Sequence, residues 1–242
     1  MKTIRPIGLL ILLLLTYPIF SRGQKAVKGN GYILTQQREL SEFTSIELSS
    51  GIDMAVVQGA SQPVMVEADD NLFPYIKTVV HDKILKIYIP DSVNIIKYGA
   101  MNILISMPEL CDLKTSNGSK VDASPQIWEL DKIHLEATTG SRIRIHVKAK
   151  QIQINARTSG IIEIRGNGQQ LEAELKTNAN LYARELKTEN ATLSLATGAR
   201  AIIEVDKAVS YELCGNARLI LRGNPVINKS EICSGSKFIR EK

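Results

Sequence analysis

Apolar and polar residues alternate in a repeated pattern through the second half of the chain, on either side of a recurring bend. Seven short segments of small residues mark the bend, and their centres lie at positions 118, 140, 159, 178, 198, 216 and 235. Six of the seven centres are Gly or Asn, which best tolerate a left-handed backbone. Self-similarity at a spacing of about 19 residues predicts one structural unit repeated along the chain.

The units share columns of apolar residues when they are aligned on these centres. Three residues after the centre come Val121, Ile143, Ile162, Leu181, Ala201, Leu219 and Phe238, and three before it come Thr115, Ala137, Ala156, Leu175, Leu195, Leu213 and Ile232. The positions five before and five after are also apolar until the last unit, which has Ser230 and Arg240. Alternation with a period of two is typical of a strand with one buried face. Each unit is therefore expected to be a strand, a tight bend and a second strand.

A unit of this size cannot bury its apolar face alone, but stacked units bury a continuous core. The expected fold class is therefore all-β: a parallel β-solenoid (β-helix) of about seven units over residues 111–238, preceded by an irregular β-rich N-terminal layer. Its crossovers are expected to be right-handed. An antiparallel sandwich is the alternative, but it would have no reason to keep one residue type at one place in every unit.

The first half of the chain divides into three further parts. Residues 38–110 contain alternating strands without a fixed period, and Asp69 or Asp70 is expected to cap a short helix over residues 71–76. Residues 24–37 form a lead-in. Residues 1–23 have a basic start, an apolar run and small residues before Gln24, which predicts a secretory signal peptide. An uncleaved membrane anchor is the alternative, but the apolar run is short for a span.

Removal of this leader changes the charge of the protein. The full chain has a formal net charge of +5, to which Lys2, Arg5 and Arg22 contribute, so the mature chain carries about +2. The basic character thus belongs largely to the leader, and nucleic-acid binding is not expected. The protein is expected to be extracytoplasmic, in the periplasm or at the cell surface, and not to span the membrane after cleavage.

Three cysteines remain in the mature chain: Cys111, Cys214 and Cys233. Cys214 and Cys233 each lie two residues before a centre in successive units, so stacking places their Cα atoms about 4.8 Å apart. That separation can accommodate a disulfide, and the sequence leaves open whether the two are bonded or are neighbouring thiols. Cys111 is expected to be a small buried hydrophobe.

Several segments of the chain also resemble a known family. They are the opening at residues 38–46, the stretches at 56–59 and 67–72, the strand at 84–87 and the passage at 107–119. Together they are similar to the head GIN domain family, whose members are described as auto-transporter adhesins and occur widely in Bacteroidota. The resemblance covers about residues 38–230. It implies a β-helical, extracytoplasmic protein and brings no family site residues with it.

Catalytic and metal-binding chemistry has little support in the sequence. The histidines lack metal-ligand spacing with one another or with the cysteines, so neither a metal nor a cofactor is expected; they are His81, His134 and His146. The strongest enzyme alternative is a polysaccharide-cleaving β-helix, with Asp122 and Glu163 two units apart on the outer face. Their expected separation of about 9.6 Å would suit an inverting carboxylate pair, but Arg144 lies between them.

One outward column is rich in cations. Two residues after the centres come Lys120, Arg142, Ile161, Asn180, Arg200, Arg218 and Lys237, and five of these are basic. A solvated ladder that keeps the units soluble and discourages edge pairing would produce the same column. The functional interpretation is a site for an anionic glycan or for phosphate headgroups, and Arg200, Arg218 and Lys237 are its longest unbroken run.

The sequence therefore predicts a secreted cell-envelope binding or adhesion module without catalytic activity. Its expected ligand-binding residues are Lys120, Arg142, Arg200, Arg218 and Lys237. The expected partners are an anionic surface polysaccharide or another envelope protein. The alternatives are a structural envelope protein with no small ligand and the polysaccharide-cleaving enzyme.

Overall fold

The computed structural model describes residues 23–233 and 235–241, so the predicted signal peptide lies outside the described residues except for Gly23. The strands of the N-terminal half are β1 (Lys25–Lys28), β2 (Ile33–Arg38), β3 (Ser45–Leu48), β4 (Asp53–Gln58), β5 (Val64–Asp69), β6 (Lys77–His81), β7 (Ile84–Tyr88), β8 (Val93–Lys97) and β9 (Met101–Met107). The strands of the C-terminal half are β10 (Asp112–Thr115), β11 (Lys120–Thr138), β12 (Arg142–Arg157), β13 (Ile161–Leu175), β14 (Asn180–Leu195), β15 (Arg200–Leu213), β16 (Arg218–Arg222), β17 (Val226–Ile232) and β18 (Lys237–Arg240). No helix in these ranges has the length and hydropathy needed to cross a bilayer.

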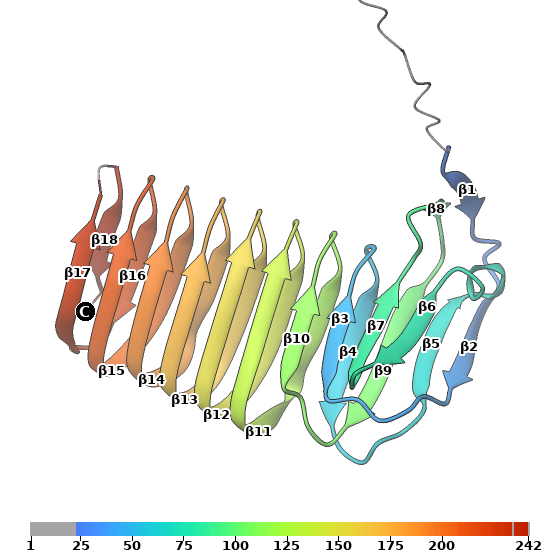
Figure 1. Ribbon diagram of the computed structural model, residues 1–242, viewed down its shortest axis with the longest axis horizontal. Helices are drawn as coiled ribbons and strands as arrows, with labels where there is room; N and C mark the ends of the chain where they lie inside the picture. The colour runs from blue at the N-terminus through green and yellow to red at the C-terminus, as the bar shows by residue number, and fades with distance from the viewer. Residues whose placement is uncertain (1–22, 234, 242) are drawn as a thin grey trace, which may run out of the picture.

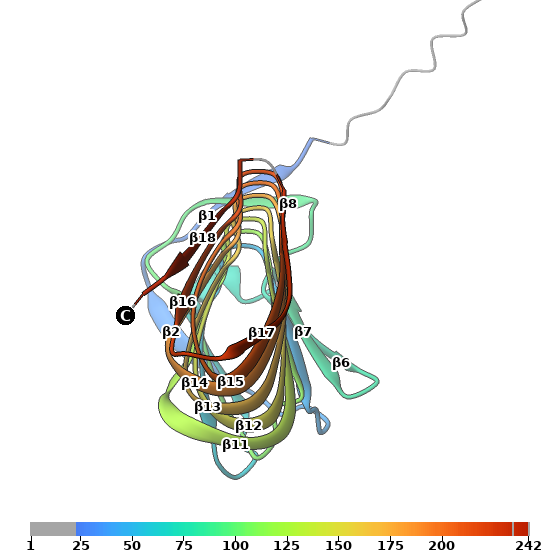
Figure 2. The ribbon, with the colours of Figure 1, turned by 90° about the vertical axis from the view of Figure 1, so that its left-hand side faces the viewer.

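Strands β10–β18 build a parallel β-solenoid, which confirms the fold predicted from the repeat (Figure 1). Each long strand from β11 to β15 follows one face, turns at the wide lower corner and returns along the other face to the next tight bend. Like positions pair between units: Ile143 lies opposite Val121 on one side and Ile162 on the other. Viewed along its axis, the stack is a flattened loop with the bends at its narrow end (Figure 2). The parallel pairing excludes the antiparallel sandwich.

The irregular N-terminal strands continue this stack. β3 pairs in parallel with β10 and β7, and β4 pairs in parallel with β11 and β9, so both faces of the solenoid extend into the first half of the chain. β2, β5 and β6 are added in antiparallel pairs at this end. Segments of unequal length separate these strands, which is why the sequence there shows no period.

The predicted inward columns form the core. In the column three residues after the centres, each side chain before the last unit is at most 2% exposed: Val121, Ile143, Ile162, Leu181, Ala201 and Leu219. Trp128 is fully buried and donates its indole N–H to the carbonyl O of Ala123 at 3.0 Å. Burying one large aliphatic side chain contributes about 1.5–3 kcal/mol, so the repeated columns are a principal source of stability.

Each of the first six tight bends has two consecutive residues in the left-handed region of backbone space. In the third bend these are Thr158 at φ 50° and Ser159 at φ 62°. The N–H of Ser159 donates to the carbonyl O of Thr177 in the next unit at 3.0 Å, so the bends are also joined along the axis. The residue after the centre is small because it packs against the preceding unit: a Cβ on Gly160 would lie 2.0 Å from the carbonyl O of Ala137.

Asp69 does not cap a helix, which corrects the sequence prediction. The only helical turn in the described part of the chain is a 3-10 turn at Asp70–Leu72, and the Asp69 side chain makes no capping bond to it. Instead, the fully buried carboxylate accepts from the backbone N–H groups of Gly31 at 2.5 Å, Gly99 at 2.7 Å and Ala100 at 3.3 Å. Asp69 thus joins the lead-in to the loop between β8 and β9.

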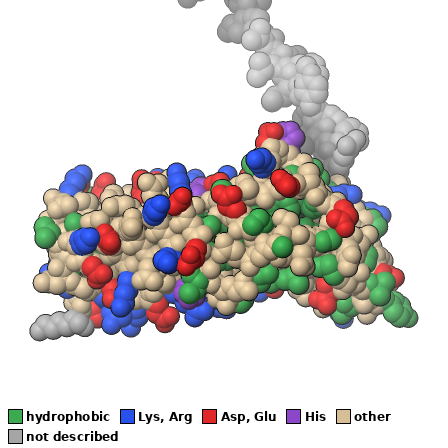
Figure 3. All heavy atoms as spheres, turned by 90° about the horizontal axis from the view of Figure 1, so that it is seen from below, with side chains coloured by type: hydrophobic (Ala, Val, Ile, Leu, Met, Phe, Trp, Pro, Cys, Tyr) green, Lys and Arg blue, Asp and Glu red, His purple; other side chains and the backbone are tan. Residues whose placement is uncertain are grey.

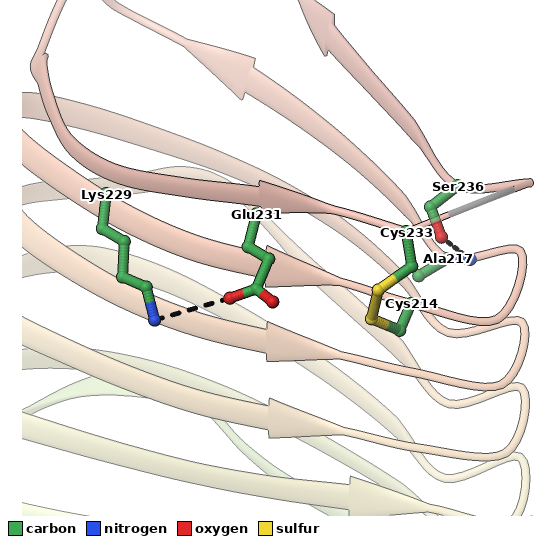
Figure 4. The surroundings of a disulfide bond; sticks show 6 residues. All are labelled: Cys214, Ala217, Lys229, Glu231, Cys233 and Ser236. Atoms are coloured by element: carbon green, nitrogen blue, oxygen red, sulfur yellow. Dashed lines mark hydrogen bonds and ion pairs between the residues drawn. A yellow bond between two sulfur atoms is a disulfide. The ribbon is translucent and has the colours of Figure 1, made fainter.

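A disulfide joins the last two units (Figure 4). The Cα atoms of Cys214 and Cys233 are 4.7 Å apart and their sulfur atoms are bonded. The bond lies beside the bend, where the N–H of Ala217 donates to Oγ of Ser236 at 3.2 Å. The disulfide therefore ties the terminal unit, made of β17 and β18, to the rest of the stack.

Replacing Cys233 by serine should loosen this terminal unit without unfolding the others. A cross-link between residues 19 positions apart contributes about 3 kcal/mol by restricting the unfolded chain, and solenoid units contact only their neighbours. Hydrogen exchange should accelerate in β17 and β18 and stay unchanged in β11–β14. The matched control is Cys111→Ser, which removes a thiol but no bond. Equal exchange in the two variants would contradict the expectation.

Candidate functional site

The basic column lies in one register row on the outer face of the solenoid. Strand pairing links its residues in the order Lys120, Arg142, Ile161, Asn180, Arg200, Arg218 and Lys237, one in each successive unit. Its five basic residues are exposed. Since neighbouring strands are about 4.8 Å apart, the last three residues place three cations within about 10 Å. We call Arg200, Arg218 and Lys237 the terminal cations.

The two ends of the basic column differ in their ionic partners. Lys120 Nζ lies 3.8 Å from a carboxylate oxygen of Asp53, and Arg142 Nε lies 3.5 Å from one of Glu163. Among residues 23–233 and 235–241, the terminal cations have no carboxylate oxygen within 4.0 Å. Positive charge is therefore left without an adjacent partner only toward the C-terminal end of the column.

An apolar stripe runs beside the terminal cations, and the sequence reasoning missed it. It consists of residues that pair in register four positions after the centres: Tyr182, Ile202, Ile220 and Ile239. Tyr182 is 46% exposed and Ile239 is 40% exposed, while the two isoleucines between them are half-buried. The signal was present in the sequence, because this outward column is charged in its first three units and apolar in its last four. The face thus combines an apolar track with a cationic edge.

A depression of about 580 Å³ opens on this face at the start of the stripe. Its charged and aromatic lining residues are Arg142, Arg144, Arg165, Arg184, Glu163, Glu185 and Tyr182. The register of β14 shifts between Ala183 and Lys187, and the consecutive residues Arg184 and Glu185 are both exposed. Irregularities of this kind redirect side chains locally. We call this depression the arginine pocket.

Hydrogen bonds hold the arginine side chains of the pocket in place. Nε of Arg144 donates to Glu163 at 3.0 Å, and the same guanidinium lies 3.7 Å from Asp122. Arg165 donates to the carbonyl O of Ser124 at 3.0 Å and has no carboxylate within 4.0 Å in the described part of the chain. Arg184 pairs with Glu241 at 3.2 Å, and Arg142 lies 3.5 Å from Glu163. Of the four guanidinium groups that line the pocket, that of Arg165 is thus the one without a carboxylate within 4.0 Å among the described residues.

Asp122 and Glu163 are not arranged as a hydrolytic pair. Burial opposes ionisation of Asp122, but hydrogen bonds from the Ser124 side chain and backbone, with the charges of Arg144 and Arg165, outweigh burial and lower the pKa of this carboxyl. Arg144 also lies between the two carboxylates. Hydrolysis of a glycosidic bond needs a carboxylic acid with a raised pKa as proton donor. The lowered pKa of Asp122 therefore does not fit a proton donor for the polysaccharide-cleaving alternative.

A second hollow lies at the wide lower corner of the stack, with a volume of about 1110 Å³. In the view from below, basic and acidic side chains are interspersed over the units (Figure 3). They pair with each other: Lys148 lies 3.2 Å from Glu129, and Lys150 lies 2.7 Å from Asp131. Six carboxylates and four lysines line this hollow, and two of the lysines are already paired, so it is less suited to an anion than the basic column is.

Cys111 lines the same hollow and is only half-buried, which differs from the buried position predicted. Its thiol donates to a carboxylate oxygen of Glu109 at 3.5 Å. Partial burial and the negative charge of Glu109 raise the pKa of the thiol. A reactive cysteine needs a lowered pKa, so Cys111 is not poised as a nucleophile.

The histidines take separate positions on the outer surface. His81 is exposed, whereas His134 and His146 are half-buried. Nδ1 of His134 lies 2.9 Å from Asp112, and burial together with the charge of Arg165 lowers the pKa of His146. In the described residues, no group of three or more His, Cys, Asp or Glu side chains is placed to hold a metal ion.

The fold defines the class of this protein, and a match to a family model defines its family. The stacked parallel units place it among the β-solenoid proteins. The family described as "Putative auto-transporter adhesin, head GIN domain" matches residues 42–225. The chain belongs to this family, as the resemblance in its sequence implied.

Solved structures share the fold at low sequence identity. A putative adhesin from Bacteroides fragilis has a TM-score of 0.82 and 17% identity, over 88% of this chain and 99% of that chain. A putative adhesin from Parabacteroides merdae has a TM-score of 0.71 and 15% identity, over 90% and 100%. A putative lipid binding protein from Parabacteroides distasonis has a TM-score of 0.69 and 17% identity, also over 90% and 100%. At these identities the likeness shows the fold alone. No curated protein matches the sequence.

Proposed function

We propose that this protein is a non-catalytic adhesion module outside the cytoplasm that holds an anionic polysaccharide along its basic column. The observation that supports this most is the register of the terminal cations on successive units, without a carboxylate partner in the described residues. Two such cations repel by about 0.9 kcal/mol in water, so the row is mildly unfavourable by itself. A polymer with repeated negative charges, lying along the axis, relieves that repulsion.

The affinity has to come from the number of contacts. One exposed ion pair contributes about 0–1 kcal/mol and is weakened by salt. Several pairs made by one polymer act together, because each later contact forms within an existing complex. The expected behaviour is weak, salt-sensitive binding to an anionic polymer in the periplasm or at the cell surface.

The variant Arg200→Gln/Arg218→Gln/Lys237→Gln should bind an anionic glycan array more weakly than wild type at low salt. Three lost contacts of about 0.5 kcal/mol each correspond to about a tenfold loss of affinity. Wild-type binding should itself fall between low and physiological salt, since exposed charges are screened. Both comparisons use the same array and the same protein concentrations.

The matched control removes the same charge from another surface. Lys148→Gln/Lys150→Gln/Lys207→Gln changes three lysines that each pair with a carboxylate, and it should bind as wild type does. If the variant of the terminal cations also binds like wild type, or if wild-type binding is independent of salt, the column only keeps the units soluble.

A second candidate function is a structural role in the envelope, through contact of the terminal unit with another protein. β17 is exposed along its whole length, and its residues Val226 and Ile232 are 66% and 50% exposed. Open strand edges pair readily with other chains. If that protein is a second copy of this chain, sedimentation should give a mass that rises with concentration, and a constant mass would argue against self-association.

A further inference from the structure

We propose that the arginine pocket is the subsite that anchors one carboxylate-bearing sugar residue of an acidic polysaccharide, with the Tyr182 ring as the platform for the sugar ring. The assignment rests on the proposed function, since it gives the anionic polymer a chemical class and a fixed starting point on the solenoid. The family match brings no site residues, and of the pocket's arginines the repeat pattern of the sequence points only to Arg142.

Tyr182 is placed to meet a ligand rather than to fill the core. It lies on the outward face of β14, in register with Glu163 and Ile202, and is 46% exposed. Its ring offers a flat apolar surface with a negative face. The C–H face of a pyranose is apolar and carries slight positive charge on its hydrogens, so the two surfaces are complementary.

Guanidinium groups from three consecutive strands line the same pocket as this ring. Arg144 comes from β12, Arg165 from β13 and Arg184 from β14. A planar guanidinium can donate two parallel hydrogen bonds to one carboxylate, and such charge-assisted bonds are stronger than neutral ones. Arg144 is already bonded to Glu163 and Arg184 to Glu241, whereas Arg165 has no carboxylate partner in the described residues. Arg165 is therefore the guanidinium best placed to receive the sugar carboxylate.

The two glutamates of the pocket have different effects on an anion. Glu163 is neutralised by Arg142 and Arg144, whose guanidinium nitrogens lie 3.5 and 3.0 Å from its oxygens. Glu185 is exposed and can accept hydrogen bonds from sugar hydroxyl groups. This combination favours an acidic sugar, which carries both hydroxyls and a carboxylate, over a simple inorganic anion.

From the pocket, the apolar stripe and the terminal cations continue the site along the axis. Ile202 and Arg200 follow in the next unit, and Ile220 and Arg218 in the one after it. Outward positions two residues apart on a strand are about 6.6 Å apart, so the stripe and the cations form two parallel rows. A polysaccharide on this track places its ring faces on the stripe and its acidic groups on the cations.

The width of the stripe favours a sugar chain over a lipid tail. The stripe is one side chain wide, and on its far side Arg222 pairs with Glu204 at 3.8 Å and with Glu241 at 3.4 Å. An acyl chain gains from full enclosure away from water, which a single row between charged side chains does not give. A chain of pyranose rings has narrow apolar faces and polar edges, which match this arrangement.

Tyr182→Ala tests the platform without changing the charge. Titration calorimetry with a short oligogalacturonate should show an affinity about fivefold to tenfold below that of wild type, the loss expected for one stacking contact. The dependence of binding on salt should stay the same. Arg165→Gln should weaken binding by a similar factor and reduce the salt dependence. Tyr88→Ala is the matched control, because Tyr88 is a 37% exposed tyrosine of β7 and should bind like wild type.

The outcomes separate this subsite from the proposed function. If Tyr182→Ala binds like wild type while the variant of the terminal cations binds more weakly, the subsite assignment is refuted and the proposed function of the basic column is supported. If wild type binds no anionic glycan, both the subsite assignment and the proposed function are refuted. Wild-type binding to vesicles of anionic phospholipid but not to oligogalacturonate would also overturn the sugar assignment. If wild type binds a neutral oligosaccharide of the same length as tightly as oligogalacturonate, the arginines do not recognise the carboxylate.

Discussion

Ile143→Asp is expected to unfold much of the solenoid under conditions in which the wild type is folded. Ile143 is fully buried and is stacked in register between Val121 and Ile162. An aspartate there would lose the apolar contacts and place an unpaired charge in the core. The expected loss is about 4 kcal/mol or more, out of the roughly 5–15 kcal/mol that stabilises a typical domain. The midpoint of urea unfolding, followed by circular dichroism, measures this loss.

The control for this substitution is Gln151→Asp in the same strand. Gln151 is exposed and pairs in register with Lys132 and Gln170, so a carboxylate there meets solvent and a lysine. Its urea midpoint should stay within about 0.5 kcal/mol of wild type. Arg144 is a poorer control, because it lies between Asp122 and Glu163. Similar midpoints for Ile143→Asp and Gln151→Asp would refute the inside and outside assignment of β12.

Asp69→Asn is expected to release the N-terminal lead-in and to cost about 3 kcal/mol. The Asp69 carboxylate is fully buried and accepts from three backbone N–H groups, and hydrogen bonds to a charged group are worth about 1.5–3 kcal/mol each before the cost of burial. An amide keeps one acceptor oxygen and brings an NH₂ group toward N–H groups that also donate. Hydrogen exchange in β1 and β2 should rise together with the fall in the urea midpoint.

The effect of Asp69 should depend on pH with a definite sign. Burial opposes ionisation of this carboxyl, but the bonds from Gly99, Gly31 and Ala100 outweigh it and hold its pKa below the usual range. A carboxyl with a folded-state pKa below its unfolded value of about 3.9 contributes stability that is fully present above that value. The contribution is lost as the pH falls through the folded-state pKa. The gap in stability between wild type and Asp69→Asn should therefore be full at neutral pH and shrink below about pH 4.

Asp70→Asn is the matched comparison for the neighbouring carboxylate. Asp70 is exposed and accepts from the Asn30 side chain, so its substitution should change stability by less than about 0.5 kcal/mol. A gap between wild type and Asp69→Asn that stays constant from neutral to acid pH would show that the charge of Asp69 does not act as described.

The solenoid fold could be predicted from the sequence because the residues of its core recur with a fixed period. Branched aliphatics such as Ile143 and Ile162 recur at fixed distances from a bend, and the observed pairing follows that alignment residue by residue. The same alignment predicts Cys214 and Cys233 at strand spacing, and their Cα atoms are 4.7 Å apart. In a stack of similar units, a residue lies beside the residue at the same position of the next unit. The pattern within one unit therefore predicts contacts between residues about 19 positions apart.

Features that depend on contacts outside the repeat could not be predicted in this way. Asp69 meets Gly31 and Gly99, which are far from it in sequence and belong to no periodic unit. The Gly29-Asn30-Gly31 segment is a partial clue, since a Cβ on Gly29 would lie 2.6 Å from the Asp69 carboxylate. The arginine pocket was missed for a different reason: the register shift in β14 that exposes both Arg184 and Glu185 breaks the alternation on which the columns were built.

The ladder of bends has a consequence for how this protein can change over evolutionary time. Among the described residues, the backbone hydrogen bonds between bends join neighbouring units, as from Ser159 to Thr177, so the bends themselves do not fix the number of units. Duplicating one unit adds about 4.8 Å to the length and one position to every outer row, and leaves the geometry of the others intact. The interruption of the basic column at Ile161 and Asn180 shows that outer residues also vary from unit to unit over an unchanged interior. The number of units and the outward side chains of each unit can therefore change independently of each other.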